Sequence, residues 1–224
     1  KKIKLSSEIR AALSIEDDEL EPDALIQLIL KAPVDLLYNG GIGTYVKSSS
    51  QTHAEANDRS NDAVRIDGKD LRCKVISEGG NLGFTQLGRI EYALCGGRIH
   101  TDAIDNSAGV DCSDHEVNIK ILLGRIMAGG DLTLKQRNEV LASMTDDVGT
   151  LVLRDNELQT LAVSLEFSQS QSLLPVHLRL MQSLEAKGKL SRRIEYLPSN
   201  SQLQERHAQG LGLSRPELAV LLAY

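Results

Sequence analysis

Residues 105–117, which read DNSAGVDCSDHEV, concentrate chemically capable side chains directly ahead of an apolar helical pattern. The stretch holds four carboxylates, one cysteine, one histidine, one asparagine and two serines. Side chains of these types ligate metals, cap helices or bind ligands. A zinc site built on Cys112 and His115 would need further ligands at a recognisable spacing, and the other histidines of the chain offer none. The sequence therefore predicts no metal site.

Helix capping explains part of this stretch. Ser113 and Glu116 fit the S-x-x-E pattern of a capping box, and Val117 opens the apolar face, so we expect a helix to begin at Asp114. The free N–H groups at a helix N-terminus, together with a serine hydroxyl, also form a site for an anion such as a carboxylate. Two interpretations stay open: Ser113 is a cap alone, or it is a cap and a ligand-binding residue at once.

A second candidate site is the glycine-rich stretch SEGGNLGF at residues 77–84. Gly79, Gly80 and Gly83 would let the backbone approach a ligand closely. Asn81 offers a donor and an acceptor at the tip of the turn. The alternative is that Asn81 only tolerates a left-handed turn conformation, and spacing alone does not separate the two interpretations.

A pattern of strand, helix and strand joins these two candidate sites. RCKVIS (72–77) reads as a strand, residues 85–95 as an amphipathic helix, and RIHTDAID (98–105) as a returning strand. A crossover of this kind implies parallel pairing. The carboxyl ends of parallel strands lie at the edge of the sheet where ligands bind. We therefore expect Asn81 and Asn106 to flank one crevice.

A third glycine-rich stretch, GGIGTYV at residues 40–46, follows a predicted strand. Gly41 and Gly43 have the spacing of the first two glycines in a dinucleotide-binding fingerprint, but Val46 stands where the third glycine belongs. A polar stretch then follows where a helix should begin. A tight turn at the end of a strand is the simpler interpretation.

The remaining patterns divide the chain into an α/β part and a helical part, with a change of composition near residue 130. A helix bracketed by Pro22 and Pro33 should lead into a buried strand at 34–39. Residues 47–62 are polar and aperiodic and predict a loop. Asp67-Gly68 predicts a two-residue hairpin. Further helices are expected at 114–128, 133–166, 174–187 and from 214 onward.

Composition narrows the function classes. The 224 residues carry 25 basic and 31 acidic side chains, a net charge of −6 that argues against nucleic acid as a main partner. No apolar run reaches the length of a membrane span, so no membrane association is expected. Three widely spaced cysteines favour a reducing cytoplasm. The chain opens without Met and stops inside an apolar helical pattern, so we expect it to be a segment of a longer protein.

Three long stretches resemble the large, NAD-specific bacterial glutamate dehydrogenases. They are KAPVDLLYNGGIGTYVK (31–47), the continuous run from EGGNLGF to NIKILL (78–123), and GLSRPELAVLLAY (212–224). More distantly, EGGN resembles the EGAN turn of the small glutamate dehydrogenases. The stretch NSAGVDCSDHE is similar to their N-A-G-G-V-T-V-S segment. The resemblance covers almost the whole chain, and its motifs are long and specific.

The resemblance implies roles at matching positions. Gly79, Gly80 and Asn81 form the cofactor-binding turn. Asn81 and Asn106 would lie along the nicotinamide and ribose of NAD, and Ser113 matches the serine that holds a substrate carboxylate. The resemblance also implies L-glutamate and 2-oxoglutarate as substrate and product, and a homo-oligomer for the longer protein.

The chain departs from the family pattern at four positions of the crevice. Ser107 and Ala108 replace Ala-Gly, and Asp111 and Cys112 replace Thr-Val, so the shape of the pocket differs there. The catalytic Lys and Asp of the family belong to a separate substrate domain, and no stretch here matches their glycine-rich lysine motif. The catalytic pair is therefore expected outside this chain.

These observations predict an α/β fold, namely the C-terminal half of a Rossmann-like parallel sheet followed by an all-α segment. Residues 1–130 would belong to the NAD-binding domain and residues 131–224 to a helical region. The longer protein would oxidise L-glutamate to 2-oxoglutarate and ammonia with NAD, and this segment would supply one wall of the crevice. The alternatives are a dehydrogenase of another amino acid and a non-catalytic regulatory module.

Overall fold

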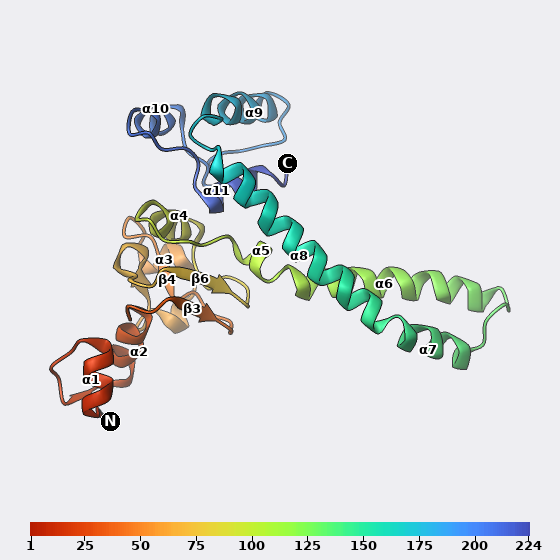
Figure 1. The fold of residues 1–224 in the computed structure, drawn as a ribbon, viewed down its shortest axis with the longest axis horizontal. Helices are drawn as coiled ribbons and strands as arrows, with labels where there is room; N and C mark the ends of the chain where they lie inside the picture. Colours follow the sequence, from red (N-terminus) through yellow and green to blue (C-terminus); the bar gives the residue numbers. More distant parts are fainter.

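The computed structural model describes residues 1–224 and shows a mixed α/β part followed by a mostly helical part (Figure 1). The strands are β1 (Ile3–Lys4), β2 (Glu19–Leu20), β3 (Leu36–Asn39), β4 (Val46–Lys47), β5 (Ile66–Asp67) and β6 (Val75–Glu78). The helices are α1 (Ser7–Leu13), α2 (Pro22–Leu30), α3 (His53–Ala56), α4 (Gln86–Leu94), α5 (Asp102–Asp105), α6 (Ser107–Ala128), α7 (Leu134–Ser143), α8 (Thr145–Ser168), α9 (Leu174–Ala186), α10 (Asn200–Ala208) and α11 (Arg215–Leu221). None of these helices combines the length and the apolar character that a membrane span requires.

The parallel strand pair β3–β6 positions the two glycine-rich turns. Asn39 lies in register with Glu78, so both strands end at the same edge. The expectation that β3 is buried was wrong, because the side chains of Leu36 and Tyr38 are 54% and 62% exposed. Within this chain β3 has one partner strand, β6.

The returning strand expected at 98–105 was also wrong. Only Arg98 pairs with the sheet, through a parallel bridge to Val75, and the chain then turns into the short helix α5. The two aspartates of α5 explain the difference, because their carboxylates accept backbone N–H groups of the glycine-rich turn region. Asp102 accepts from Leu82 at 2.7 Å and Asp105 from Glu78 at 3.0 Å. Residues three apart on a helical turn share one face, which is what these two bonds require.

No hairpin forms at Asp67-Gly68. β5 ends at Asp67 and pairs in parallel with β4, and residues 68–70 form a 3-10 turn. The predicted loop at 47–62 was wrong in part, because it contains α3 and a second 3-10 turn. A capping box between Thr52 and Glu55 opens α3.

Helix α4 follows the glycine-rich turn and begins as predicted. The hydroxyl of Thr85 accepts the N–H of Gly88 at 3.0 Å, which caps the helix. The predicted apolar face was only partly right: Ile90 is buried, whereas Leu94 is 47% exposed. The face turned toward the sheet instead carries Arg89, a charged side chain that is 4% exposed.

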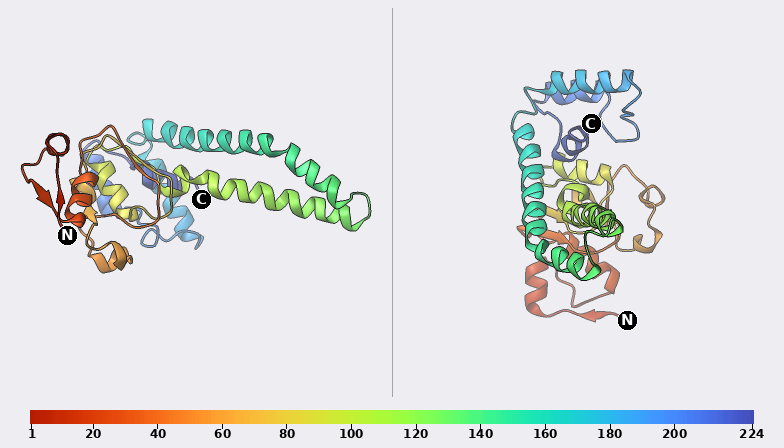
Figure 2. Two further views of the ribbon diagram at one scale, coloured as in Figure 1. Left: turned by 90° about the horizontal axis from the view of Figure 1, so that it is seen from below. Right: turned by 90° about the vertical axis from the view of Figure 1, so that its right-hand side faces the viewer.

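Helices α6, α7 and α8 form a long arm that projects from the α/β part (Figures 1 and 2). α6 runs out to Gly129, and α7 and α8 return alongside it. A capping box of Thr133 with Gln136 opens α7, at the start of the helix predicted from residue 133. The single helix expected over 133–166 is instead two helices that meet at Met144.

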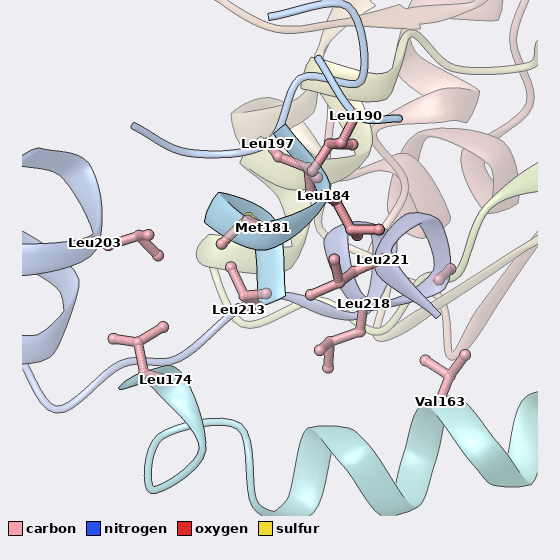
Figure 3. Close-up of a cluster of buried hydrophobic side chains, with 11 residues drawn as sticks. Val163, Leu174, Met181, Leu184, Leu190, Leu197, Leu203, Leu213, Leu218 and Leu221 are labelled. Atoms are coloured by element: carbon pink, nitrogen blue, oxygen red, sulfur yellow. The ribbon is translucent and has the colours of Figure 1, made fainter. Parts of the chain in front are cut away.

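The helical part has its own core (Figure 3). Met181, Leu213 and Leu218 are almost fully buried in it. α9 and α11 confirm the predicted helices, while α10 was missed although Ser199 and Gln202 form its capping box. The eleven buried members are Val163, Leu174, Met181, Leu184, Leu190, Leu197, Leu203, Leu213, Leu218, Ala219 and Leu221.

Helix α11 returns to the α/β part and packs against α4. The side-chain amide of Gln86, in the first turn of α4, donates to the carbonyl of Pro216 at 3.1 Å, across 130 residues of sequence. α8 makes a second link, because Asn156 donates to the Ile104 carbonyl and to the Ser107 hydroxyl. The division of the chain near residue 130 stays a prediction.

The three cysteines differ in exposure, which gives a first testable prediction. Cys73 is buried and hydrogen-bonded with Tyr92, and burial raises the pKa of its thiol, whereas Cys95 and Cys112 are exposed. Because the thiolate is the reactive form, a thiol reagent should modify two cysteines quickly in the folded 224-residue chain. The third should react only on unfolding. A count of three fast thiols by mass spectrometry would contradict the packing around Cys73.

Candidate functional site

Two glycine-rich turns lie side by side at the carboxyl edge of β3 and β6. The N–H of Gly79 donates to the Asn39 carbonyl at 2.9 Å and extends the pairing of the strands into the turns. A Cβ on Gly80 would lie 2.9 Å from the carbonyl oxygen of Gly41, so the two backbones leave no room for a side chain there. The sequence predicted that these glycines let a ligand approach the backbone. In the structure Gly80 lets the two turns approach each other.

Asn81 and Asn106 come together at this edge, as the sequence predicted. The side-chain amide of Asn106 donates to the side-chain oxygen of Asn81 at 3.0 Å, across 25 residues of sequence. Asn81 is exposed and Asn106 is half-buried. The pair leaves free donor and acceptor capacity facing outward, because each primary amide carries two N–H groups and a carbonyl with two lone pairs.

A buried ionic cluster lies beneath the turn. Glu78, at the end of β6, is fully buried and accepts two hydrogen bonds from Arg89, at 2.6 and 2.9 Å. The guanidinium of Arg89 also lies 3.1 Å from a carboxylate oxygen of Asp102. Two further carboxylates accept hydrogen bonds from the backbone. The N–H of Leu82 donates to Asp102, and the N–H of Glu78 donates to Asp105.

The electrostatics of this cluster depend on Arg89. Burial raises the pKa of the Glu78 carboxyl, and the hydrogen bonds and charge of Arg89 oppose that rise. Nearby Asp102 and Asp105 raise it further. Burial also works against the charge of Arg89, but its bonds and ion pair with Glu78, followed by Asp102, raise the pKa of the guanidinium, which stays protonated. One buried cation therefore holds two carboxylates in place, those of Glu78 and Asp102.

Ser113 does not begin a helix, so the capping prediction was wrong. α6 starts six residues earlier, at Ser107, and Ser113 lies inside it with its hydroxyl donating to the Gly109 carbonyl at 3.2 Å. The early start has a long-range cause: Ser107 is buried and bonded to Asn156 of α8, which no local pattern encodes. Glu116 pairs with Lys120 on the helix surface instead of closing a capping box.

Ser113 lies on the side of α6 that continues in register from Asn106. At 3.6 residues per turn, positions 106, 110, 113 and 117 share one side of the helix. Val110, Ser113 and Val117 are all exposed on that side. Ser113 is therefore an accessible hydroxyl about two turns along the helix from Asn106.

The opposite side of α6 faces α8 and carries two of the other polar residues of the motif, Asp111 and His115. His115 lies 3.5 Å from Asp111 and 4.0 Å from Asp155 of α8. The ligand atoms of these three side chains lie within 4.8 Å of one another, and all three residues are half-buried. Cys112 is exposed on α6 and does not join this group. The arrangement links the two helices through a histidine set between two carboxylates.

Sequence reasoning missed Glu78, Arg89 and Asp102 as parts of the site. Helical spacing gave no signal for Arg89, because Leu87, Ile90 and Leu94 define another side of the predicted helix. The burial of Arg89 in the structure is what requires a buried partner. The turn at 40–46 does not show the dinucleotide fingerprint, since strand β4, not a helix, follows it.

Comparison with known proteins adds the following findings. Residues 1–166 match the family model described as bacterial NAD-glutamate dehydrogenase, catalytic domain. Over all of its length the chain is 55% identical to the NAD-specific glutamate dehydrogenase of Pseudomonas aeruginosa and 50% identical to that of Halomonas elongata. It is also 50% identical, over 230 residues, to the NAD-specific glutamate dehydrogenase of Mycobacterium tuberculosis. The chain spans 14% of the length of each of these three relatives.

Proposed function

This chain belongs to the bacterial NAD-glutamate dehydrogenase family, and from that membership we propose that the longer protein oxidises L-glutamate with NAD. The products would be 2-oxoglutarate, ammonia and NADH. When bound, NAD accepts the hydride at its nicotinamide ring, and the residues of this chain position that ring and one end of the substrate. The observation that carries the proposal is the Asn81–Asn106 pair at the edge where two glycine-rich turns meet.

Asn81 and Asn106 fit the nicotinamide half of NAD. Their amides are neutral, accessible and already oriented by one mutual hydrogen bond, so they can pair with a carboxamide and with ribose hydroxyls. Gly79 and Gly80 let the turn that carries Asn81 pack closely against Tyr38 and the backbone of Gly41. The chain offers no comparable cradle for the pyrophosphate, which we place on parts of the protein beyond these residues.

Ser113 fits the role of holding a substrate carboxylate. Its hydroxyl is exposed on the same side of α6 as Asn106. Seven residues separate the two, which is about 10 Å along a helix. That spacing leaves room for the reacting carbon of the substrate to lie near the nicotinamide while its far carboxylate reaches the serine.

The fold supports this assignment in its coarse form. We propose that β3, β6 and the Arg98 bridge are the C-terminal half of a Rossmann-like sheet, in which the exposed side of β3 is covered by other parts of the protein. We also propose that the longer protein works as a homo-oligomer in the cytoplasm, where the three cysteines of this chain would stay reduced.

The isolated 224-residue chain should not oxidise glutamate, which is a second testable prediction. No stretch of this sequence matches the motif that carries the catalytic Lys of the family, so the Lys and Asp pair expected for proton transfer lies outside this chain. The isolated chain would therefore hold only the proposed nicotinamide site. The measurement is NADH formation from glutamate by the purified chain, next to the full-length protein as the positive control. Turnover by the isolated chain would show that its own residues complete the reaction.

The substrate is tested separately with the full-length protein. Rates of NADH formation with glutamate should exceed those with aspartate and with neutral amino acids, since only glutamate places its second carboxylate at the distance of Ser113. Faster turnover of another amino acid would assign a different dehydrogenase activity. Absence of both NAD binding and turnover would favour a regulatory module.

A further inference from the structure

The cluster of Glu78, Arg89 and Asp102 lies outside any direct contact with the proposed ligands, yet it touches the coenzyme turn at several points. We propose that Arg89 is a positioning residue for NAD: through Glu78 and Asp102 it fixes the backbone of residues 79–83, which carry Asn81. This inference rests on the proposed function and adds to it a residue that neither cofactor nor substrate would touch.

Glu78 closes the base of the turn. It stands immediately before the turn, and its oxygen Oε1 accepts both the N–H of Phe84, which follows the turn, at 3.2 Å and Nη2 of Arg89 at 2.9 Å. The other oxygen, Oε2, accepts Nε of Arg89 at 2.6 Å. The two ends of the turn are thus tied to one carboxylate, and Arg89 sets the orientation of that carboxylate.

Asp102 holds the tip of the turn. One of its oxygens lies 3.1 Å from Nη2 of Arg89, and the other accepts the N–H of Leu82 at 2.7 Å. Leu82 has a φ of 59°, in the left-handed region that a leucine adopts only where its surroundings hold it. Leu82 directly follows Asn81, so the strain is maintained at the residue next to the proposed nicotinamide contact.

The charge balance makes Arg89 the element on which the cluster depends. Glu78, Asp102 and Asp105 bring three carboxylates to this buried region, and Arg89 is bonded to two of them. Removing the guanidinium leaves a buried carboxylate without its cation, which forces protonation or repulsion. In either case the carboxylate of Glu78 or Asp102 can rotate away from its present position. The hydrogen bonds that it accepts from the backbone N–H groups of Phe84 or Leu82 would then be lost.

A lysine cannot replace Arg89 fully. The guanidinium is a planar fork with five donors, and here it reaches both oxygens of Glu78 and one of Asp102 at once. An ammonium is a point charge on a flexible stem and pairs with one of these oxygens at a time. Arg89→Lys should therefore retain the charge and lose part of the geometry.

The experiment measures the dissociation constant for NAD and the melting temperature of the full-length protein. Arg89→Met should weaken NAD binding at least tenfold, and Arg89→Lys should recover part of that loss. The matched control is Arg206→Met, which breaks the buried ion pair with Glu217 (2.6 Å) in the helical part. It should lower the melting temperature comparably and leave NAD affinity within twofold of the wild type.

Asp102→Asn serves as a second variant if Arg89→Met fails to fold, because it keeps the size of the side chain and should still weaken NAD binding several-fold. Normal NAD affinity in Arg89→Met or Asp102→Asn, with stability lost as in the control, would overturn the inference. Asn81→Ala distinguishes failure of the inference about Arg89 from failure of the proposed function. If Asn81→Ala weakens NAD binding and the cluster variants do not, only the role of Arg89 is wrong.

Discussion

Replacing Ser113 by alanine in the full-length protein should raise the KM for glutamate about tenfold or more and leave the KM for NAD unchanged. A hydroxyl that donates to a substrate carboxylate makes a charge-assisted bond worth about 1.5–3 kcal/mol, which corresponds to that change in affinity. Stability should hardly change. Ser113 lies inside α6 and bonds only the Gly109 carbonyl of its own helix, so its loss removes no cap. Surface changes of this kind stay within about 0.5 kcal/mol.

The matched control for Ser113 is Ser143→Ala. Ser143 is likewise an exposed helical serine, and its hydroxyl donates to the carbonyl of Val140 in its own helix at 2.8 Å. It should alter neither KM. If Ser113→Ala behaves like this control in steady-state kinetics, the carboxylate assignment is wrong and the serine is an ordinary surface residue of α6.

Asn81→Ala should have the reverse signature, raising the KM for NAD about fivefold to a hundredfold while the KM for glutamate changes little. The substitution removes the hydrogen bonds proposed to the nicotinamide and ribose, at about 0.5–1.5 kcal/mol each, and also the bond that orients Asn106. Fluorescence titration with NADH and steady-state kinetics would both report this loss. The melting temperature should stay near that of the wild type, because Asn81 is exposed.

Asn118→Ala controls for the loss of an exposed asparagine on α6. Asn118 donates only to the Asp114 carbonyl at 2.8 Å, so NAD binding should be unaffected. The double variant at positions 81 and 106 adds a further test. If the two amides act as one unit, its loss of NAD affinity will be smaller than the sum of the single losses. Unchanged NAD affinity in all of these variants would remove this edge as the cofactor site.

Local signals in the sequence predicted several of the elements and missed those that depend on distant contacts, together with α3 and α10, whose capping boxes are local. The start of α4 at Thr85 and the end of α6 before Gly129 follow from a cap and a glycine pair, which are local. The start of α6 does not, because Ser107 is held by Asn156, 49 residues away. The S-x-x-E pattern at Ser113 was a chance match to a capping box inside a longer helix.

The sequence was enough to predict where the candidate site lies, but not the buried residues that hold it in place. The structure brings Asn81 and Asn106 together at one edge, although the parallel strand from which this was predicted does not form. The strand expected at 98–105 was lost because Asp102 bonds the turn instead of extending the sheet. A carboxylate that accepts a backbone N–H twenty residues away leaves no periodic trace in the sequence.

The contact between Gln86 and Pro216 has a consequence for synthesis in the cell. Those 130 residues must leave the ribosome before α11 can cover α4. At about 5–20 residues per second, translation takes roughly 6 to 26 seconds over that span. During this time the surface of α4 that α11 covers stays exposed to water and to other nascent chains. The packing of α11 on α4 is thus timed by the translation of α11, and chaperones have a window of seconds in which to bind the uncovered helix.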